Sequence, residues 1–139
     1  MTLDFSFGII PYHKETKRFL IIQHTKDHWS FPKGHPEKNE MHTETAVREL
    51  FEETGLTTIS IDPREFKEEY TFIHNGEAIH KTVTYFIGFI ESVEVIIQEK
   101  EVKDFAWLTF EEALSQITFD NTLYLAKEAH AYLKTSSQL

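Results

Sequence analysis

Residues 34–56, GHPEKNEMHTETAVRELFEETGL, constrain the fold of this chain more than any other stretch. They begin as a loop containing glycine and proline and change near His42 to a helical pattern that continues to Thr54. Gly55 follows at once, in the position where helices commonly end in a left-handed conformation. The stretch therefore predicts a loop followed by a helix over residues 42–54 that ends at Gly55.

The predicted helix has two sides of different character. One side has the i, i+3, i+4, i+7 spacing of a face that packs on a core, and it contains Val47, Leu50, Phe51 and Thr54. Glu49, Glu52 and Glu53 converge on the opposite side. A solvated acidic face is the simplest interpretation of such a run. Like charges four residues apart repel, however, whereas hard divalent cations bind several carboxylates together with phosphates, so we favour a metal site.

The rest of the chain alternates strand and loop patterns before it returns to helix. Apolar and β-branched runs predict strands at residues 5–12, 19–24, 56–61, 69–74, 82–90, 93–97 and 105–108. Asn75-Gly76 is a strong hairpin signal, and residues 25–40 are expected to form a long loop. Helical patterns follow at residues 110–117 and 121–134. This order predicts a layered α/β or α+β fold, and residues 1–139 contain no repeat or linker that would divide them into two domains.

Charge and composition exclude some classes of function. The net charge of −9 disfavours general binding to nucleic acid and to anionic membranes, although cations can still bridge a phosphate compound to carboxylates. Cysteine is absent, which excludes disulfide and thiol chemistry and fits a reducing compartment. No apolar run is long enough to span a membrane, and we expect a cytoplasmic protein. The sequence does not indicate an oligomeric state.

The acidic stretch also resembles a known family. Gly34, Glu40 and the run from Arg48 to Leu56 match every specified position of the Nudix box, G-x5-E-x7-R-E-U-x-E-E-x-G-U, where U is aliphatic. The resemblance to Nudix hydrolases implies an α/β/α sandwich with a mixed central sheet and a loop-helix-loop catalytic motif. It also implies hydrolysis of a nucleoside diphosphate linked to a further group.

The resemblance implies a set of ligands for Mg²⁺ or Mn²⁺. The set comprises Glu49, Glu52 and Glu53, assisted by the carbonyl of Gly34. This fold usually adds one acidic residue before a Trp-Leu pair, and by that register we choose Glu101. Glu99 is the alternative, and a solvated loop carboxylate would explain either residue without a metal. The general base is expected among Glu49, Glu52 and Glu101.

Other positions of the box have supporting roles by the same resemblance. Arg48 would orient the glutamates, and Glu40 would brace the loop. Asn39 stands where many relatives have glycine. Asparagine tolerates a positive φ better than most residues, so we expect the loop to be retained.

The residues before the box indicate a substrate. His28 to His35 read HWSFPKGH, and W-x-x-P-K-G-H resembles the asymmetric diadenosine tetraphosphate hydrolase branch of the family. Lys33 offers a compact positive charge to a polyphosphate oxygen. His35 could donate to such an oxygen or make a merely structural hydrogen bond. By resemblance Tyr85 and Phe119 fall where aromatic rings clamp an adenine, although plain core packing would also explain both residues.

The expected reaction is hydrolysis of a small-molecule dinucleoside polyphosphate, with diadenosine tetraphosphate giving ATP and AMP. The residues expected to carry it are Lys33, Arg48, Glu49 and Glu52. One alternative is another Nudix activity, on RNA 5′-triphosphates, inositol pyrophosphates or nucleoside triphosphates. Another is a non-catalytic Nudix module that senses a nucleotide or a protein partner. Such modules typically lose carboxylates of the box, and none is lost here.

Overall fold

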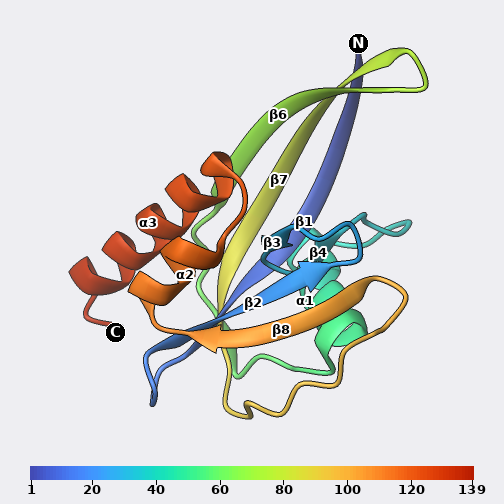
Figure 1. Ribbon diagram of the computed structural model, residues 1–139. Coiled ribbons are helices and arrows are strands. Elements are labelled where there is room, and N and C mark those ends of the chain that lie inside the picture. Colours follow the sequence, from blue (N-terminus) through green and yellow to red (C-terminus); the bar gives the residue numbers. More distant parts are fainter.

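Eight strands form one mixed sheet, and three helices cover its two faces (Figure 1). The computed structural model describes residues 1–139. Its elements are β1 (Thr2–His13), β2 (Arg18–His24), β3 (Trp29–Ser30), β4 (Lys33–Gly34), α1 (His42–Thr54), β5 (Ser60–Ile61), β6 (Phe66–His74), β7 (Glu77–Phe89), β8 (Val102–Leu108), α2 (Phe110–Gln116) and α3 (Asp120–Thr135). None of the helices is both long and apolar enough to cross a membrane.

The centre of the sheet is a parallel pair formed by β1 and β7. Their register runs from Thr2 opposite Ile79 to Tyr12 opposite Phe89. All other pairs are antiparallel: β2 and β4 pair with β1, β5 and β6 pair with β7, and β3 and β8 pair with β2. Strands from both halves of the chain therefore meet on the two sides of β1.

Side chains of the central strands alternate between two cores. Ile10 and Tyr12 of β1 belong to the core beneath α2 and α3, whereas Phe7 and Ile9 belong to the core beneath α1. A strand buried on both faces needs a nearly continuous apolar run, which explains the sequence FGIIPY. The two cores with their covering helices make the α/β/α sandwich, and the predicted fold class is confirmed.

The predicted turns have the expected backbone conformations. Gly55 ends α1 with a φ of 75°, and its N–H donates to the carbonyl of Phe51 at 2.8 Å. Asn75 and Gly76 have φ values of 51° and 78° and join β6 to β7, as the hairpin signal predicts. Asn39 has a φ of 63°, so asparagine supplies the left-handed residue of the loop before α1.

Two of the predicted strands are largely absent from the structure, and β6, β7 and β8 each begin earlier than predicted. Only Ser60–Ile61 of the predicted strand at 56–61 is extended and paired, and residues 93–97 form no strand. Instead, the N–H of Ile96 donates to the carbonyl of Thr54 at 2.9 Å, and the N–H of Gln98 donates to that of Glu53 at 3.1 Å. These bonds satisfy carbonyls that the end of α1 leaves open, so the segment covers the helix end rather than joining the sheet.

This covering segment also changes which side of α1 is buried. Phe51, predicted to face the core, is 56% exposed, whereas Glu53, predicted on the open acidic side, is 1% exposed. The buried residues of the helix are Thr45, Ala46, Leu50, Glu53 and Thr54. Because residues 96–98 close over the last turn, the buried arc is rotated toward Glu53 and away from Phe51.

Candidate active site

Three carboxylates meet between α1 and the loop that precedes β8. Glu49, Glu53 and Glu101 each offer an oxygen, and these oxygens lie within 4.8 Å of one another. The loop is fixed at this point because the N–H of Thr25, which follows β2, donates to the carbonyl of Glu101 at 3.2 Å. The structure therefore brings the predicted extra acid, Glu101 rather than Glu99, to the carboxylates of the helix. We call these three residues the acid cluster.

Glu53 shows that the acid cluster fits a cation. Its Oε2 is buried and has no hydrogen-bond partner. Burial raises the pKa of this carboxyl strongly, and the adjacent carboxylates of Glu49 and Glu101 raise it further. A buried polar atom without a partner is costly, and two neighbouring negative charges increase the cost of its ionised form. A divalent cation would supply the missing partner and neutralise this charge, and oxygen donors are the ligands that Mg²⁺ and Mn²⁺ prefer.

Gly34 allows the backbone to lie against the acid cluster. β4 pairs with β1 at Phe7 and Gly8, which holds Gly34 beside α1. A Cβ added at Gly34 would overlap the carboxylate of Glu49. Glycine is therefore needed here for space. A cation held by Glu49 would lie beside the backbone of Gly34.

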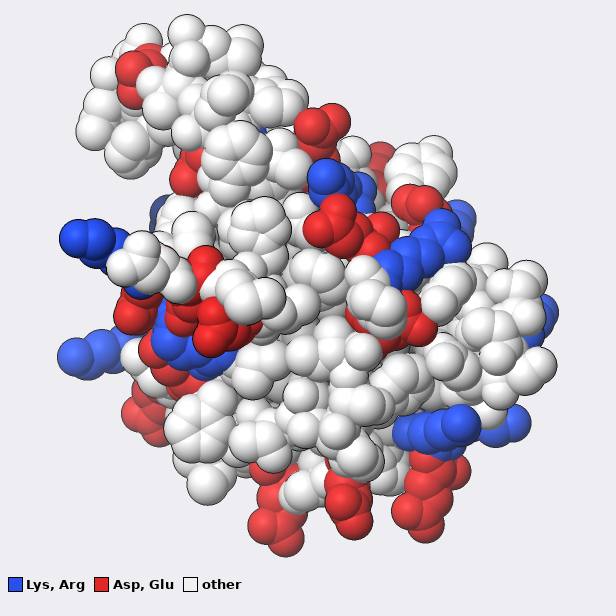
Figure 2. Space-filling view, turned by 180° about the vertical axis from the view of Figure 1, so that it is seen from behind, with Lys and Arg blue, Asp and Glu red and all other residues white.

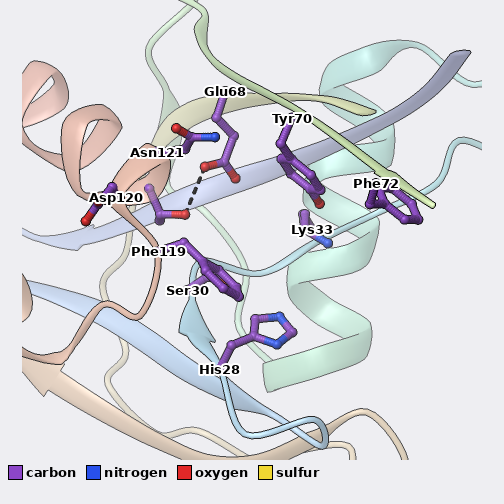
Figure 3. Close-up of a pocket in the computed structure, with 10 residues that line it drawn as sticks. His28, Ser30, Lys33, Glu68, Tyr70, Phe72, Phe119, Asp120 and Asn121 are labelled. Carbon is purple, nitrogen blue, oxygen red and sulfur yellow. Dashed lines mark hydrogen bonds between the residues drawn. The ribbon is translucent and has the colours of Figure 1, made fainter. Parts of the chain in front are cut away.

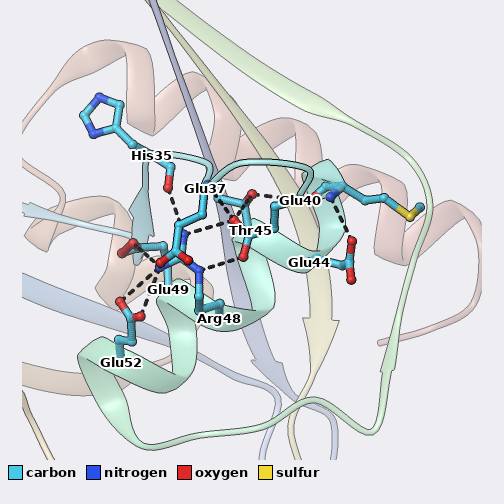
Figure 4. Close-up of polar contacts among 9 residues, drawn as sticks. His35, Glu37, Glu40, Glu44, Thr45, Arg48, Glu49 and Glu52 are labelled. Atoms are coloured by element: carbon cyan, nitrogen blue, oxygen red, sulfur yellow. Dashed lines mark hydrogen bonds and ion pairs between the residues drawn. The ribbon is translucent and has the colours of Figure 1, made fainter.

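Arg48 joins the loop before α1 to the carboxylates of the helix (Figure 4). Its Nε donates to Glu40 at 2.7 Å, its Nη1 to Glu49 at 3.1 Å and its Nη2 to the carbonyl of His35 at 2.9 Å. The hydrogen bond from Arg48 lowers the pKa of Glu40 to about 2, with help from the hydroxyl of Thr45. This network fixes both the loop and the direction of the Glu49 side chain.

Glu52 lies apart from the acid cluster. Its side chain is 50% exposed, and its carboxylate accepts from Nη1 of Arg48 at 3.0 Å. Its oxygens are not among those that converge at the three-residue cluster. The structure thus divides the three glutamates of the box: two point into the cluster, and one lies at its solvent side.

A second cavity, of about 520 Å³, opens between β6, the start of α3 and the segment around β3 and β4 (Figure 3). It is lined by His28, Ser30, Lys33, Glu68, Tyr70, Phe72, Phe119, Asp120, Asn121 and Thr122. We call it the aromatic cavity. His28 and Lys33 also line the cavity of about 530 Å³ that contains the acid cluster. The two cavities therefore adjoin, and the Lys33 side chain lies between them.

The aromatic rings of this cavity come from two elements. Phe119, directly before α3, is 54% exposed, and Tyr70 and Phe72 stand on β6 across the cavity from it (Figure 3). Tyr85, the other predicted clamp, is 0% exposed and packs edge-on against Phe31 at 5.8 Å between ring centroids. The prediction for Tyr85 is wrong, because its ring is closed in the core beneath α3 and no base can stack on it.

The sequence does not predict a role for Tyr70, Phe72 or Glu68. The three residues follow each other at every second position of β6, which places them on one face. Strand register, which sequence alone did not supply, brings that face to the aromatic cavity. The available signal in the sequence was EEYTF, in which the large side chains of Glu68, Tyr70 and Phe72 stand at alternate positions.

His35 already has hydrogen-bond partners within the chain. Its Nε2 lies 3.0 Å from Asp4 and 3.2 Å from Nζ of Lys81. The buried Lys81 in turn lies 2.8 Å from Asp4 and donates to Ser6 at 2.6 Å. The structural hydrogen bond that the sequence left as an alternative for His35 is therefore present, although its ring remains largely exposed beside Gly34.

Lys33 is the main positive charge between the cavities. Burial lowers the pKa of its ammonium, and Lys81 lowers it further, whereas the carboxylates of Glu53 and Glu68 act in the opposite direction. A half-buried ammonium that feels the charge of carboxylates on two sides is suited to a ligand that carries several negative charges across this point.

The structure is an α/β/α sandwich with a mixed sheet, and its loop-helix motif gathers carboxylates beside a glycine. This combination is the one implied by the resemblance to Nudix hydrolases. A NUDIX domain model matches residues 2–127, and the chain belongs to the Nudix family. It is 31% identical over 122 residues to the asymmetrical bis(5′-nucleosyl)-tetraphosphatase of Rattus norvegicus, which covers 85% of this chain and 82% of the rat protein.

Two further similarities agree with this family. Over 101 residues the chain is 34% identical to the MutT4 protein of Mycobacterium tuberculosis, covering 73% of this chain and 40% of that protein. The fold is similar to that of a Caenorhabditis elegans Ap4A hydrolase in a binary complex, with a TM-score of 0.80 at 24% identity, covering 95% and 98% of the two chains. At this identity the structural match supports the fold alone.

Proposed function

We propose that this chain is a Mg²⁺-dependent hydrolase of dinucleoside polyphosphates that cuts diadenosine tetraphosphate into ATP and AMP. The observation that carries the proposal is that the aromatic cavity adjoins the acid cluster and that Lys33 lies between them. A substrate with a flat base at one end and a chain of phosphates fits this arrangement. The name of the rat relative, an asymmetrical bis(5′-nucleosyl)-tetraphosphatase, supports the same substrate.

In this proposal the side chains divide the work of binding. Phe119 stacks on one face of a base, and the rings of Tyr70 and Phe72 contact it from β6; each stacked base contributes about 1–3 kcal/mol. Lys33 binds the phosphate chain where it passes from one cavity to the other. His35, whose Nε2 lies 3.0 Å from Asp4 and whose ring is largely exposed, donates to a phosphate oxygen in this proposal once it turns away from Asp4.

The acid cluster would hold Mg²⁺ or Mn²⁺ through Glu49, Glu53 and Glu101, beside the backbone of Gly34. When bound, such an ion lowers the pKa of water and neutralises phosphate charge. Arg48 keeps Glu49 directed into the cluster. Glu52 lies outside the three-residue group, is half exposed and accepts a hydrogen bond from Arg48. It is one candidate for the base that takes a proton from the attacking water, and Glu49 and Glu101 are the others.

The test is incubation with diadenosine tetraphosphate and Mg²⁺, followed by chromatographic separation of the products. We expect equal amounts of ATP and AMP. Two molecules of ADP per substrate would overturn the asymmetric cut. No turnover here, together with release of pyrophosphate from RNA with a 5′-triphosphate, would replace the proposal with that second Nudix activity.

The net charge of −9 favours the dinucleotide over RNA. On the face seen in Figure 2, Lys and Arg lie scattered among Asp and Glu and form no continuous basic surface for a long polyanion. The non-catalytic alternative is disfavoured because every carboxylate of the box is present and two of them converge with Glu101. The single domain over residues 1–139 and the cytoplasmic location stay predictions.

A further inference from the structure

A carboxylate lines the inner end of the aromatic cavity. Glu68 of β6 is 8% exposed, yet it is one of the residues that line this cavity (Figure 3). Its Oε2 accepts a hydrogen bond from the hydroxyl of Thr122 at 2.8 Å, and its Oε1 accepts a long one from the hydroxyl of Tyr85 at 3.4 Å. A carboxylate can accept about four hydrogen bonds, so lone pairs remain for a ligand.

The fold itself gains little from a charge at this place. Glu68 forms no ion pair, its hydrogen-bond partners are two hydroxyl groups, and the charge of Lys33 favours its ionised form only from beyond ion-pair distance. Burial raises the pKa of its carboxyl, which reflects the cost of removing the charge from water. An apolar residue of similar size would avoid this cost, since well-packed apolar groups often replace buried charges without loss of stability. A ligand that donates to the carboxylate would offset the cost.

The position of Glu68 relative to the rings indicates which part of a ligand it contacts. β6 places Glu68, Tyr70 and Phe72 on the same face, and Phe119 lies opposite. A base between these rings must direct its ribose and phosphates toward Lys33, where the two cavities adjoin. The edge of the base that points away from the ribose is then the edge available to Glu68. In a purine this edge carries the substituent at position 6.

We propose that Glu68 selects the base by accepting a hydrogen bond from the 6-amino group of adenine. Hypoxanthine has a carbonyl oxygen at position 6, which faces the carboxylate with an acceptor instead of a donor; its one donor on this edge, N1–H, lies one ring position away. Stacking on the three rings is tolerant of base identity and therefore does not distinguish the two bases. The identification of the aromatic cavity as a base site rests on the proposed function, whereas the preference for adenine is an additional claim.

The kinetic test compares diadenosine and diinosine tetraphosphate as substrates. For the wild type we expect kcat/KM to be higher for the adenosine compound by about 10- to 100-fold, the range of one hydrogen bond to a charged group. In Glu68→Gln the amide can donate to the carbonyl of hypoxanthine, so the ratio should fall toward one. The matched control is Glu69→Gln, the same change at the next residue, which is exposed and on the other face of β6. Its ratio should equal that of the wild type.

A binding test separates this inference from the proposed function. Calorimetric titration of the wild type with AMP and with IMP needs neither turnover nor a variant. AMP binding about 10-fold or more tighter than IMP, with this ratio lost in Glu68→Gln and without hydrolysis of either dinucleotide, would support the role of Glu68 and overturn the proposed reaction. Equal affinities for AMP and IMP, or an unchanged ratio in a folded Glu68→Gln variant, would overturn the role of Glu68 and leave the proposed reaction standing.

Discussion

At the scale of single residues, Glu53 shows that the candidate metal site lowers the stability of the fold. Its carboxylate is buried without a hydrogen-bond partner and lies beside two other carboxylates. Helical periodicity identified Glu49, Glu52 and Glu53 as an acidic group but assigned Glu53 to the open side and Phe51 to the core. The error arose because the segment that covers the end of α1 is more than forty residues away in the sequence, and periodicity describes only the helix.

Glu53→Gln should abolish Mg²⁺-dependent hydrolysis and leave the thermal unfolding temperature unchanged or raised. The reason is that the variant removes an anionic ligand and, at the same time, relieves repulsion from Glu49 and Glu101. Hydrolysis rates and calorimetric unfolding measure the two effects. Glu99→Gln, an exposed change in the loop that carries Glu101, is the control and should keep full activity. Full activity in Glu53→Gln would contradict the assignment of the acid cluster.

The Glu40–Arg48 pair makes stability depend on pH in a defined window. Arg48 lowers the folded-state pKa of Glu40 from 4.5 to about 2, so the ionised form is favoured in the folded protein. This contribution is complete above about pH 4.5 and is lost as the pH falls toward 2. We therefore expect the unfolding temperature to fall less steeply between pH 4.5 and 2 in Glu40→Gln than in the wild type. Parallel curves from thermal unfolding at stepped pH would show that the pair does not act in this way.

At the scale of elements, the antiparallel pairing of β4 with β1 decides where Lys33 and Gly34 lie. β4 has only two residues and pairs with Phe7 and Gly8. The sequence predicted a long loop over residues 25–40, because a strand of two residues has no periodicity and is defined only by a distant partner. The buried parts of the longer strands β1, β2 and β7 were predicted, since burial on both faces leaves a continuous apolar pattern, whereas the exposed starts of β1 at Thr2 and of β7 at Glu77 were not.

Two glycine substitutions where β4 pairs with β1 should separate stability from activity. A Cβ at Gly8 would overlap the carbonyl of Pro32 and contact Lys33 and Tyr85 at 2.8 Å, so Gly8→Ala must separate β1 from β4 and should destabilise the fold by about 1–3 kcal/mol or more. A Cβ at Gly34 meets only the flexible end of Glu49, so Gly34→Ala should unfold near the wild-type temperature but lose most activity. Denaturant unfolding and hydrolysis assays of both variants test this. Equal stability of the two variants would contradict the argument.

At the scale of the whole molecule, the site is assembled from both layers of the sandwich. α1 and the loop before β8 provide the acid cluster, whereas β6 and the start of α3 provide the aromatic cavity. The sequence motif covered only the first of these parts, which is why the carboxylates were predicted and the aromatic residues of β6 were not. The aromatic cavity depends on the register of β6 and on the position of α3, and neither follows from the local sequence pattern.

Divalent cations should stabilise the folded chain as a whole. Binding to the folded state alone contributes about 2.7 kcal/mol when the free cation is at 100 times its dissociation constant. We expect the unfolding temperature to rise with added MgCl₂ and to return to its starting value with a chelator. In Glu53→Gln the rise should be much smaller, because one of the three converging carboxylates is lost. An equal rise in the variant would place cation binding elsewhere.

The parallel pair at the centre of the sheet also has a consequence for the order of folding. β1 and β7 lie at opposite ends of about ninety residues of chain, and their register pairs Thr2 with Ile79 and Tyr12 with Phe89. The longest ladder of the molecule therefore cannot form during synthesis until β7 has been made. Closing so large a loop before any ladder contact is gained makes such pairings slow. Until then β1 has an apolar strand with an open edge, so early synthesis is the stage at which this chain is most exposed to aggregation.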